Sequence, residues 1–173
     1  MAEYTQVEIE RLISCPKNVQ DPPRRQGPKL VDADYRNDMK LAASNQGPEN
    51  PAPGEFTVFM RQSEDFPENF SIGLTYHPND GRQEITLVRC NGKHGIFNSR
   101  TNFNPDHAHW DFHIHRADAA LLDVGFKAEK IAQKTTEYAS YEEALPFFLK
   151  MINLDDRDVE RYFPSEAQSN FFE

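Results

Sequence analysis

The sequence predicts an α+β domain in which an antiparallel sheet of about five strands carries an N-terminal helix and one or two C-terminal helices packed on it. Stretches that alternate apolar and polar residues follow one another through the middle of the chain, between residues 35 and 115. Capping-box signatures lie near the two ends, at Thr5–Glu8 and Ser140–Glu143. A run of strands with helices at its ends is typical of the α+β class.

The two capping boxes define the expected terminal helices. After Thr5–Glu8, apolar residues recur at helical spacing until Cys15–Pro16 ends the first helix. After Ser140–Glu143 a second apolar stripe follows, and Pro146 lies about a turn and a half inside it. Since proline cannot donate the backbone hydrogen bond of a helix interior, this helix is expected to kink or to begin late.

The strands are expected where alternation is strongest. They fall at residues 35–41, 56–60, 70–76, 84–90 and 110–115. His77–Gly81 supplies turn chemistry between the third and fourth, so the spacing predicts an antiparallel meander. Residues 117–124 predict a short helix that Gly125 stops, and residues 126–138 lean towards strand.

Length and composition predict one domain over residues 1–173. A proline-rich connector is expected at 16–29, where four prolines oppose both helix and ladder, and a charged tail at 155–173. The 28 acidic residues exceed the 19 Lys and Arg, for a formal charge of −9. This charge opposes broad, sequence-independent binding of nucleic acid but leaves room for a local basic groove.

Cysteine usage and the chain start favour a cytoplasmic location. Cys15 and Cys90 lie far apart without a CxxC pair, which indicates neither a zinc knuckle nor a disulfide framework. The first residues contain no apolar core of a signal peptide, and no window has the length of a membrane span. No contact with a membrane is therefore expected.

Four of the six histidines occur within nine residues, in His107–His115. From Trp110 the pattern alternates, which predicts a strand with its aromatic and aliphatic residues on one face. The opposite face would carry the ionisable residues His109, Asp111, His113 and His115. Clustered titratable groups favour a functional site, and the alternative is a polar face whose His and Asp residues bond one another across strands.

A divalent metal ion is one interpretation of this cluster. Residues two apart on a strand are about 6.5 to 7 Å apart along the chain, so His113 and His115 could converge on one ion. Zinc takes about four ligands, and two would have to come from elsewhere. The candidates are His94, Asp106, His107 and Asp111.

Acid/base catalysis is the other interpretation. An imidazole with a pKa near 6.5 is present in both protonation states at neutral pH, so His113 and His115 could act as base and acid on RNA. His109 or Asp111 would orient one of them. Cleavage by attack of the RNA's own 2′-hydroxyl also needs a cation near the phosphate. The candidate phosphate contacts are Lys93, Arg100 and Arg116, with Arg116 the first choice.

Several segments also resemble known families. Phe59–Gln62, Asp65–Leu74, Arg89–Gly92 and Asp111–His115 look like a family of small uncharacterised bacterial proteins, over roughly residues 33 to 153. More remotely, the His-x-His strand, the short helix and Tyr138–Leu145 resemble the TumE-like toxins of bacterial toxin–antitoxin systems. The second resemblance implies an activity directed at nucleic acid in a defence or stress setting, such as phage defence.

The resulting functional hypothesis is a small bacterial toxin-like or defence-related nuclease, with RNA as its expected substrate. The alternative is a non-enzymatic acidic protein, inhibitor or antitoxin-like, that binds a basic protein partner or a second copy of itself. Lys and Arg clustered around the histidine strand would favour the nuclease. A broad acidic face with buried histidines would favour the binder.

Overall fold

The computed structural model describes residues 3–25, 34–44, 54–94 and 110–165. In these ranges the chain forms four helices and seven strands. The helices are α1 (Gln6–Ser14), α2 (Ala119–Asp123), α3 (Tyr141–Met151) and α4 (Asp156–Tyr162). The strands are β1 (Lys17–Arg25), β2 (Asp34–Ala43), β3 (Gly54–Ser63), β4 (Phe70–Pro78), β5 (Ile85–Asn91), β6 (His113–Arg116) and β7 (Ala132–Lys134).

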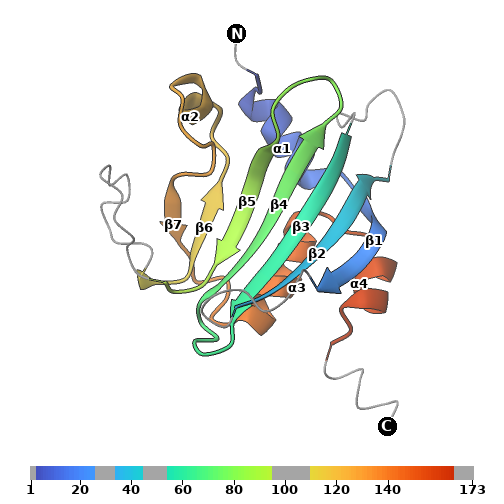
Figure 1. The fold of residues 1–173 in the computed structure, drawn as a ribbon, viewed down its shortest axis with the longest axis vertical. Helices are drawn as coiled ribbons and strands as arrows, with labels where there is room; N and C mark the ends of the chain where they lie inside the picture. The colour runs from blue at the N-terminus through green and yellow to red at the C-terminus, as the bar shows by residue number, and fades with distance from the viewer. Residues whose placement is uncertain (1–2, 26–33, 45–53, 95–109, 166–173) are drawn as a thin grey trace.

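The strands form one antiparallel sheet in sequence order, from β1 to β7. Every strand pairs with the next strand along the chain, which is the expected meander. In Figure 1 the sheet lies across the front of the molecule, and α1, α3 and α4 lie behind it. The predicted α+β class is therefore confirmed, with seven strands in place of about five.

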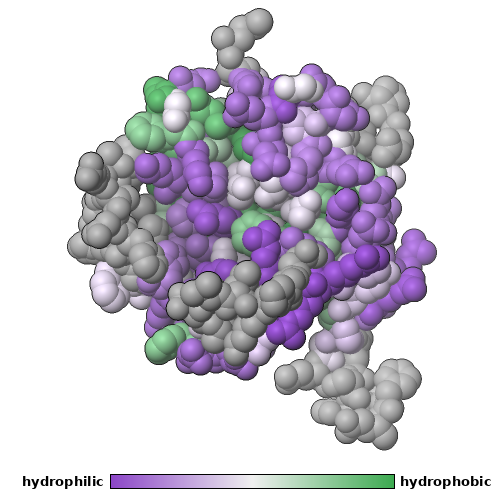
Figure 2. Space-filling view, in the orientation of Figure 1, coloured by the Kyte–Doolittle hydropathy of each residue, from purple (hydrophilic) through white to green (hydrophobic). Residues whose placement is uncertain are grey.

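One face of the sheet packs against the helices. The expected strand residues Phe70, Ile72, Leu74 and Tyr76 of β4 are all fully buried there. α1 contacts β5, α3 contacts β4 and α4 contacts β1. We call the opposite side, which no described helix covers, the uncovered face. In Figure 2, which views this side, its described surface is mostly hydrophilic.

The helix starts follow the two capping boxes. Thr5 caps α1 by accepting a hydrogen bond from the backbone N–H of Glu8, at 3.1 Å. Ser140 caps α3 in the same way through Glu143. α3 begins directly after this cap and contains Pro146, so the helix does not begin late. Gly125 has a φ of 83°, in the left-handed region expected for a residue that stops a helix.

The connector expected at 16–29 is wrong over its first part. Lys17–Arg25 is an edge strand, β1, and residues 26–29 lie outside the described part of the chain. Its register with β2 shifts between Asp21 and Arg24, around Pro22 and Pro23. Proline is tolerated at bulges and on edge strands because no ladder hydrogen bond is needed from it there. The prolines therefore shape β1 without preventing it.

The remaining differences lie near the C-terminus. Residues Ala132–Lys134 form the short edge strand β7, within the stretch that leaned towards strand. The charged tail contains the helix α4, which Asp155 caps through the N–H of Arg157. The strand expected from residue 110 begins at His113, and Trp110 before it is 61% exposed.

In the described ranges, no helix is long and apolar enough to cross a membrane.

Lys17 is a buried cation in the core. Its ammonium group donates hydrogen bonds of 2.8 Å to the carbonyl oxygens of Ile13, Cys15 and Ile152. It therefore joins the end of α1 to the end of α3. Burial lowers the pKa of Lys17 to about 8, while the three carbonyl groups favour the charged form.

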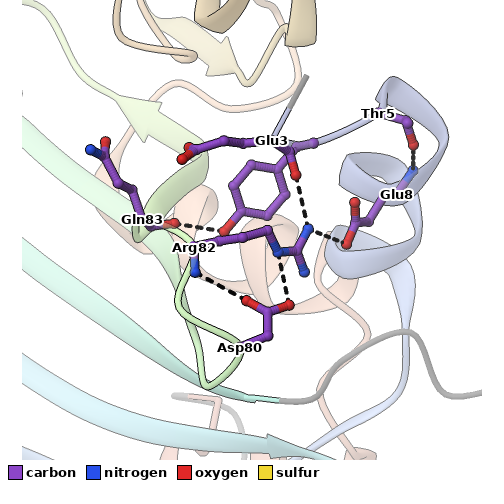
Figure 3. Close-up of polar contacts among 7 residues, drawn as sticks. Glu3, Thr5, Glu8, Asp80, Arg82 and Gln83 are labelled. Carbon is purple, nitrogen blue, oxygen red and sulfur yellow. Dashed lines mark hydrogen bonds and ion pairs between the residues drawn. The ribbon is translucent and has the colours of Figure 1, made fainter. Parts of the chain in front are cut away.

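A second polar cluster fastens the N-terminal segment to the turn between β4 and β5 (Figure 3). Arg82 donates to the carboxylates of Glu8 and Asp80, at 2.7 and 2.8 Å, and to the carbonyl of Glu3. The hydroxyl of Tyr4 donates to the carbonyl of Gln83 at 2.6 Å. Since these contacts lie at the far end of β5 from β6's His113, they position α1 and are not part of the candidate site.

Candidate functional site

Cross-strand pairing places two adjacent rows of residues on the uncovered face. The Arg61 row consists of Arg36, Arg61, Ser71, Asn91, His113 and Lys134. The Arg89 row consists of Asp38, Phe59, Gly73, Arg89, His115 and Ala132. Members of the two rows are two residues apart on every strand, so both rows point away from the helices.

The two rows are cationic although the chain is acidic. They contain four Arg and Lys residues and one carboxylate, Asp38, which gives a formal charge of +3 with neutral histidines. Arg36 pairs with Asp38 at 2.9 Å, and Lys134 pairs with Asp111 at 3.3 Å. Arg61 donates a hydrogen bond to the side-chain oxygen of Asn69 at 3.2 Å, and Arg89 adds the fourth positive charge of the two rows.

Arg89 lies opposite His115 in the pairing of β5 with β6. Burial is the largest influence on its guanidinium and lowers its pKa; the charge of Glu129 opposes this effect and that of Arg61 adds to it. In the described part of the chain, nothing accepts a hydrogen bond from the buried Nε of Arg89. The burial of a cation costs free energy, and so does its repulsion by a second cation. A bound anion would reduce both costs.

The ring of Phe59 lies over Gly73 in the Arg89 row. A Cβ atom at Gly73 would collide with the end of this ring, so the absence of a side chain gives Phe59 its place. The guanidinium of Arg36 lies 5.3 Å from the ring centroid, within the range of a cation–π contact. The middle of the uncovered face therefore combines an aromatic surface with cations.

His94 and His113 face each other through their Nε2 atoms, which are 3.1 Å apart. The Nδ1 of His113 lies 2.8 Å from the backbone carbonyl oxygen of Asp111. Because a carbonyl oxygen only accepts, this Nδ1 carries a hydrogen, and in the neutral ring Nε2 is an acceptor. His94 then donates from Nε2. If His113 is protonated, the donor and acceptor at this contact exchange roles.

His115 extends the row of rings. Its ring centroid lies 5.1 Å from that of His113, with the two planes at 73°. His113 is fully buried and His115 is 4% exposed, whereas His94 is half-buried. His94 is therefore the member of this group with most access to solvent.

Tyr138 fixes the strand that carries these rings. Its hydroxyl lies 3.0 Å from the carbonyl oxygen of Asn91 on β5 and 2.7 Å from that of His113 on β6. It approaches from the helix side and contacts the ring of Phe70. Burial raises the pKa of Tyr138 far above its ordinary value, so the hydroxyl stays a hydrogen-bond donor at any physiological pH.

The structure brings only some of the predicted residues together. His113 and His115 share a face, as alternation predicts. Asp111 meets His113 through its backbone carbonyl, and its carboxylate pairs with Lys134. His109 and Arg100 lie outside the described residues.

The other two predicted phosphate contacts, Arg116 and Lys93, each lie close to a carboxylate. Arg116 is on the helix side of β6, where it pairs with Glu10 of α1 at 3.7 Å. Lys93 lies 3.9 Å from Glu68 and over the ring of Phe112. Sequence reasoning had favoured these cations because they are near the cluster in sequence. It missed Arg61 and Arg89, which reach the site only through strand pairing.

No group of three or more His, Cys, Asp or Glu side chains with metal-site geometry occurs among the residues that the structure describes. The two cysteines offer no ligand pair, since Cys90 is buried in the core and burial raises its pKa to about 12. The described residues therefore supply at most two His, Cys, Asp or Glu ligands to any one metal ion.

The fold and the two rows define a class of protein: an α+β domain with a seven-stranded antiparallel meander and a cationic, histidine-bearing uncovered face. No protein-family model, no curated protein and no solved structure matches the chain at a significant level. The functional argument therefore depends on the chemistry of the site alone.

Proposed function

We propose that this chain is a small toxin-like or defence-related ribonuclease that binds RNA across the two rows of the uncovered face. The observation that carries the proposal is Arg89, a desolvated guanidinium beside His115 whose Nε has no acceptor among the described residues. Arg61 adds a second positive charge close by. A phosphate group offers two oxygen acceptors that a planar guanidinium group can bind with a pair of parallel hydrogen bonds.

The histidines supply the acid/base chemistry. His94, the half-buried member, accepts the proton of an RNA 2′-hydroxyl, and the resulting charge is shared with His113 across their 3.1 Å contact. The 2′-oxygen attacks the adjacent phosphorus, and the bond to the 5′-oxygen breaks. His115, opposite Arg89, protonates that leaving oxygen. The products are a 2′,3′-cyclic phosphate and a free 5′-hydroxyl.

The acidic composition does not oppose binding at this face. The chain carries −9 overall, but the two rows carry a formal charge of +3. RNA approaches a local cationic surface, and the acidic remainder limits binding elsewhere. The aromatic ring of Phe59 in the Arg89 row adds a surface on which a base can stack.

A second candidate function is an acidic protein, inhibitor or antitoxin-like, that binds a basic protein partner. The burial of His113 and His115 favours this alternative, because a buried imidazole that is already hydrogen-bonded can be structural. In that case the cationic rows would have no catalytic role. The two functions differ in whether the purified chain acts on RNA at all.

The test is cleavage of a labelled single-stranded RNA of mixed sequence by the wild type, Arg89→Gln and His94→Gln. Arg157→Gln is the matched control, because Arg157 is 93% exposed and lies on α4. We expect the wild type to cleave, the first two variants to lose at least about 100-fold, and the control to be unchanged. A single-stranded DNA of the same sequence lacks the attacking 2′-hydroxyl groups and should resist cleavage.

Circular dichroism and melting temperature should match among the four proteins before rates are compared. Chelation by EDTA should leave the rate intact, since the proposed step uses only side chains. A folded wild type that neither cleaves nor binds RNA would overturn the proposal and leave the acidic binding protein as the better hypothesis.

A further inference from the structure

The contact between His94 and His113 has the geometry of two ligands of one metal ion. Their Nε2 atoms are 3.1 Å apart and face each other. For metal–nitrogen distances of 2.0 to 2.1 Å, this separation corresponds to an angle at the metal of about 95 to 102°. That value lies between the octahedral and tetrahedral angles, so a divalent ion fits after small movements of the two rings.

We infer that His94 and His113 form a binding site for a divalent metal ion of the zinc type. The ion takes the place of the hydrogen that lies between the two Nε2 atoms in the free protein. This inference does not depend on the proposed ribonuclease activity, because it concerns binding and not a reaction. The pair differs from the one that the sequence indicated, His113 with His115, because the Nε2 of His113 points to His94.

A second feature supports the assignment. The Nδ1–H of His113 is held by the backbone carbonyl of Asp111 at 2.8 Å. Histidine ligands of metals usually donate their other ring N–H to a carbonyl or carboxylate, which fixes the tautomer and directs the lone pair of the ligating nitrogen. His113 therefore already has the tautomer and orientation that a metal ligand needs.

The strand pairing keeps this orientation rigid. His113 begins β6, where it pairs with Asn91 of β5, and the hydroxyl of Tyr138 contacts both backbones. His94 is only three residues beyond Asn91, which ties the second ligand to the same pair of strands. His94 is half-buried, so the ion enters the site from the solvent next to His94.

The number of ligands sets the expected affinity. The described residues offer no third His, Cys, Asp or Glu ligand. A site with two of the usual four protein ligands should bind zinc with a dissociation constant on the order of 1 to 100 µM, far weaker than a structural zinc site.

The experiment is calorimetric titration of the metal-free full chain with zinc chloride. We compare the wild type with His94→Gln, His113→Asn and the control His77→Asn. His77 is a suitable control, because it is a partly exposed histidine of β4 that bonds Thr57 and Glu84. We expect one ion per chain, at least a tenfold loss of affinity in the first two variants, and a change under twofold in the control.

His113→Asn changes a buried residue. If His113→Asn does not fold, the result for His94→Gln alone decides the test. Zinc that binds His94→Gln as tightly as the wild type, or no binding by the wild type, overturns the inference. Zinc should also inhibit RNA cleavage, since metal and proton compete for the same nitrogen atoms. Zinc binding without cleavage rejects only the ribonuclease, and cleavage without zinc binding rejects only the metal site.

Discussion

Leu74 and Thr75 are neighbours in β4 and point to opposite faces of the sheet. Leu74 is fully buried against the helix side. Thr75 is half-buried on the uncovered face, 3.3 Å from the hydroxyl of Thr86. The helix face thus consists mainly of apolar side chains that water never reaches, and the uncovered face of polar groups, cations and histidines. This difference indicates that stability and ligand binding depend on separate sets of residues in the same strands.

The largest expected effect tests this division directly. Leu74→Ala should lower the free energy of unfolding by about 2 to 5 kcal/mol, because it leaves a cavity in the core. Thr75→Ala should lower it by less than about 1 kcal/mol, since only one long contact between hydroxyl groups is lost. Urea denaturation followed by circular dichroism measures both. Equal losses in the two variants would contradict the division between the faces.

Lys17 is an exception on the helix side, since it is a charged group that is fully buried there. Its folded-state pKa is lowered to about 8 from an ordinary value of 10.5, so the unfolded chain binds more protons between these two values. The free energy of unfolding should therefore rise as the pH rises from 8 to 10.5, on the order of 2 kcal/mol. Below pH 8 Lys17 is protonated in both the folded and the unfolded chain, so its contribution to the free energy of unfolding stays at its lowest value.

The variant Lys17→Met isolates this effect. The wild type should gain stability relative to Lys17→Met as the pH rises, measured by urea denaturation at pH 7.5 and pH 10. Cys90 and Tyr4 have folded-state pKa values raised to about 12, and they reduce stability at high pH. Both proteins contain them, so the difference cancels their effect. A difference that does not change with pH would show that the three carbonyl groups keep Lys17 fully charged.

The division between the faces also explains which parts of the fold could be predicted. Strands β3, β4 and β5 have one apolar face, and the period of two in their sequences predicts them. β1 carries Pro22 and Pro23 and packs little apolar surface, so its sequence resembles that of a loop. It becomes a strand because β2 provides an edge and the bulge accommodates both prolines.

The candidate site could be predicted only along one strand. Alternation predicts that His113 and His115 share a face, and this is confirmed. Arg61 and Arg89 could not be connected with them, because their places in the same rows as the histidines depend on the register of three strand pairs. His94 follows a glycine in what reads as a turn, and a single histidine in a turn gives no signal of its own.

The smallest expected effect concerns Asp111 on the uncovered face. Its carboxylate pairs with Lys134 at 3.3 Å, and both side chains are about half exposed, at 54% and 50%. An exposed pair of this kind contributes less than about 1 kcal/mol, so Asp111→Asn should change stability only slightly. The sequence hypothesis gave this carboxylate the task of orienting a histidine. The contact with His113 comes instead from the backbone carbonyl, which Asp111→Asn keeps.

The zinc affinity and the rate of RNA cleavage of Asp111→Asn should therefore stay within about twofold of the wild type, as for an exposed substitution away from a site. Lys134→Gln is the matched control for the zinc affinity, since it removes the same ion pair from the other side and leaves His94 and His113 unchanged. A tenfold loss in Asp111→Asn alone would assign the orienting role to the carboxylate. Equal small changes in both variants would leave the backbone carbonyl as the group that orients His113, so that the strand geometry and not a side chain prepares this ring for its ligand.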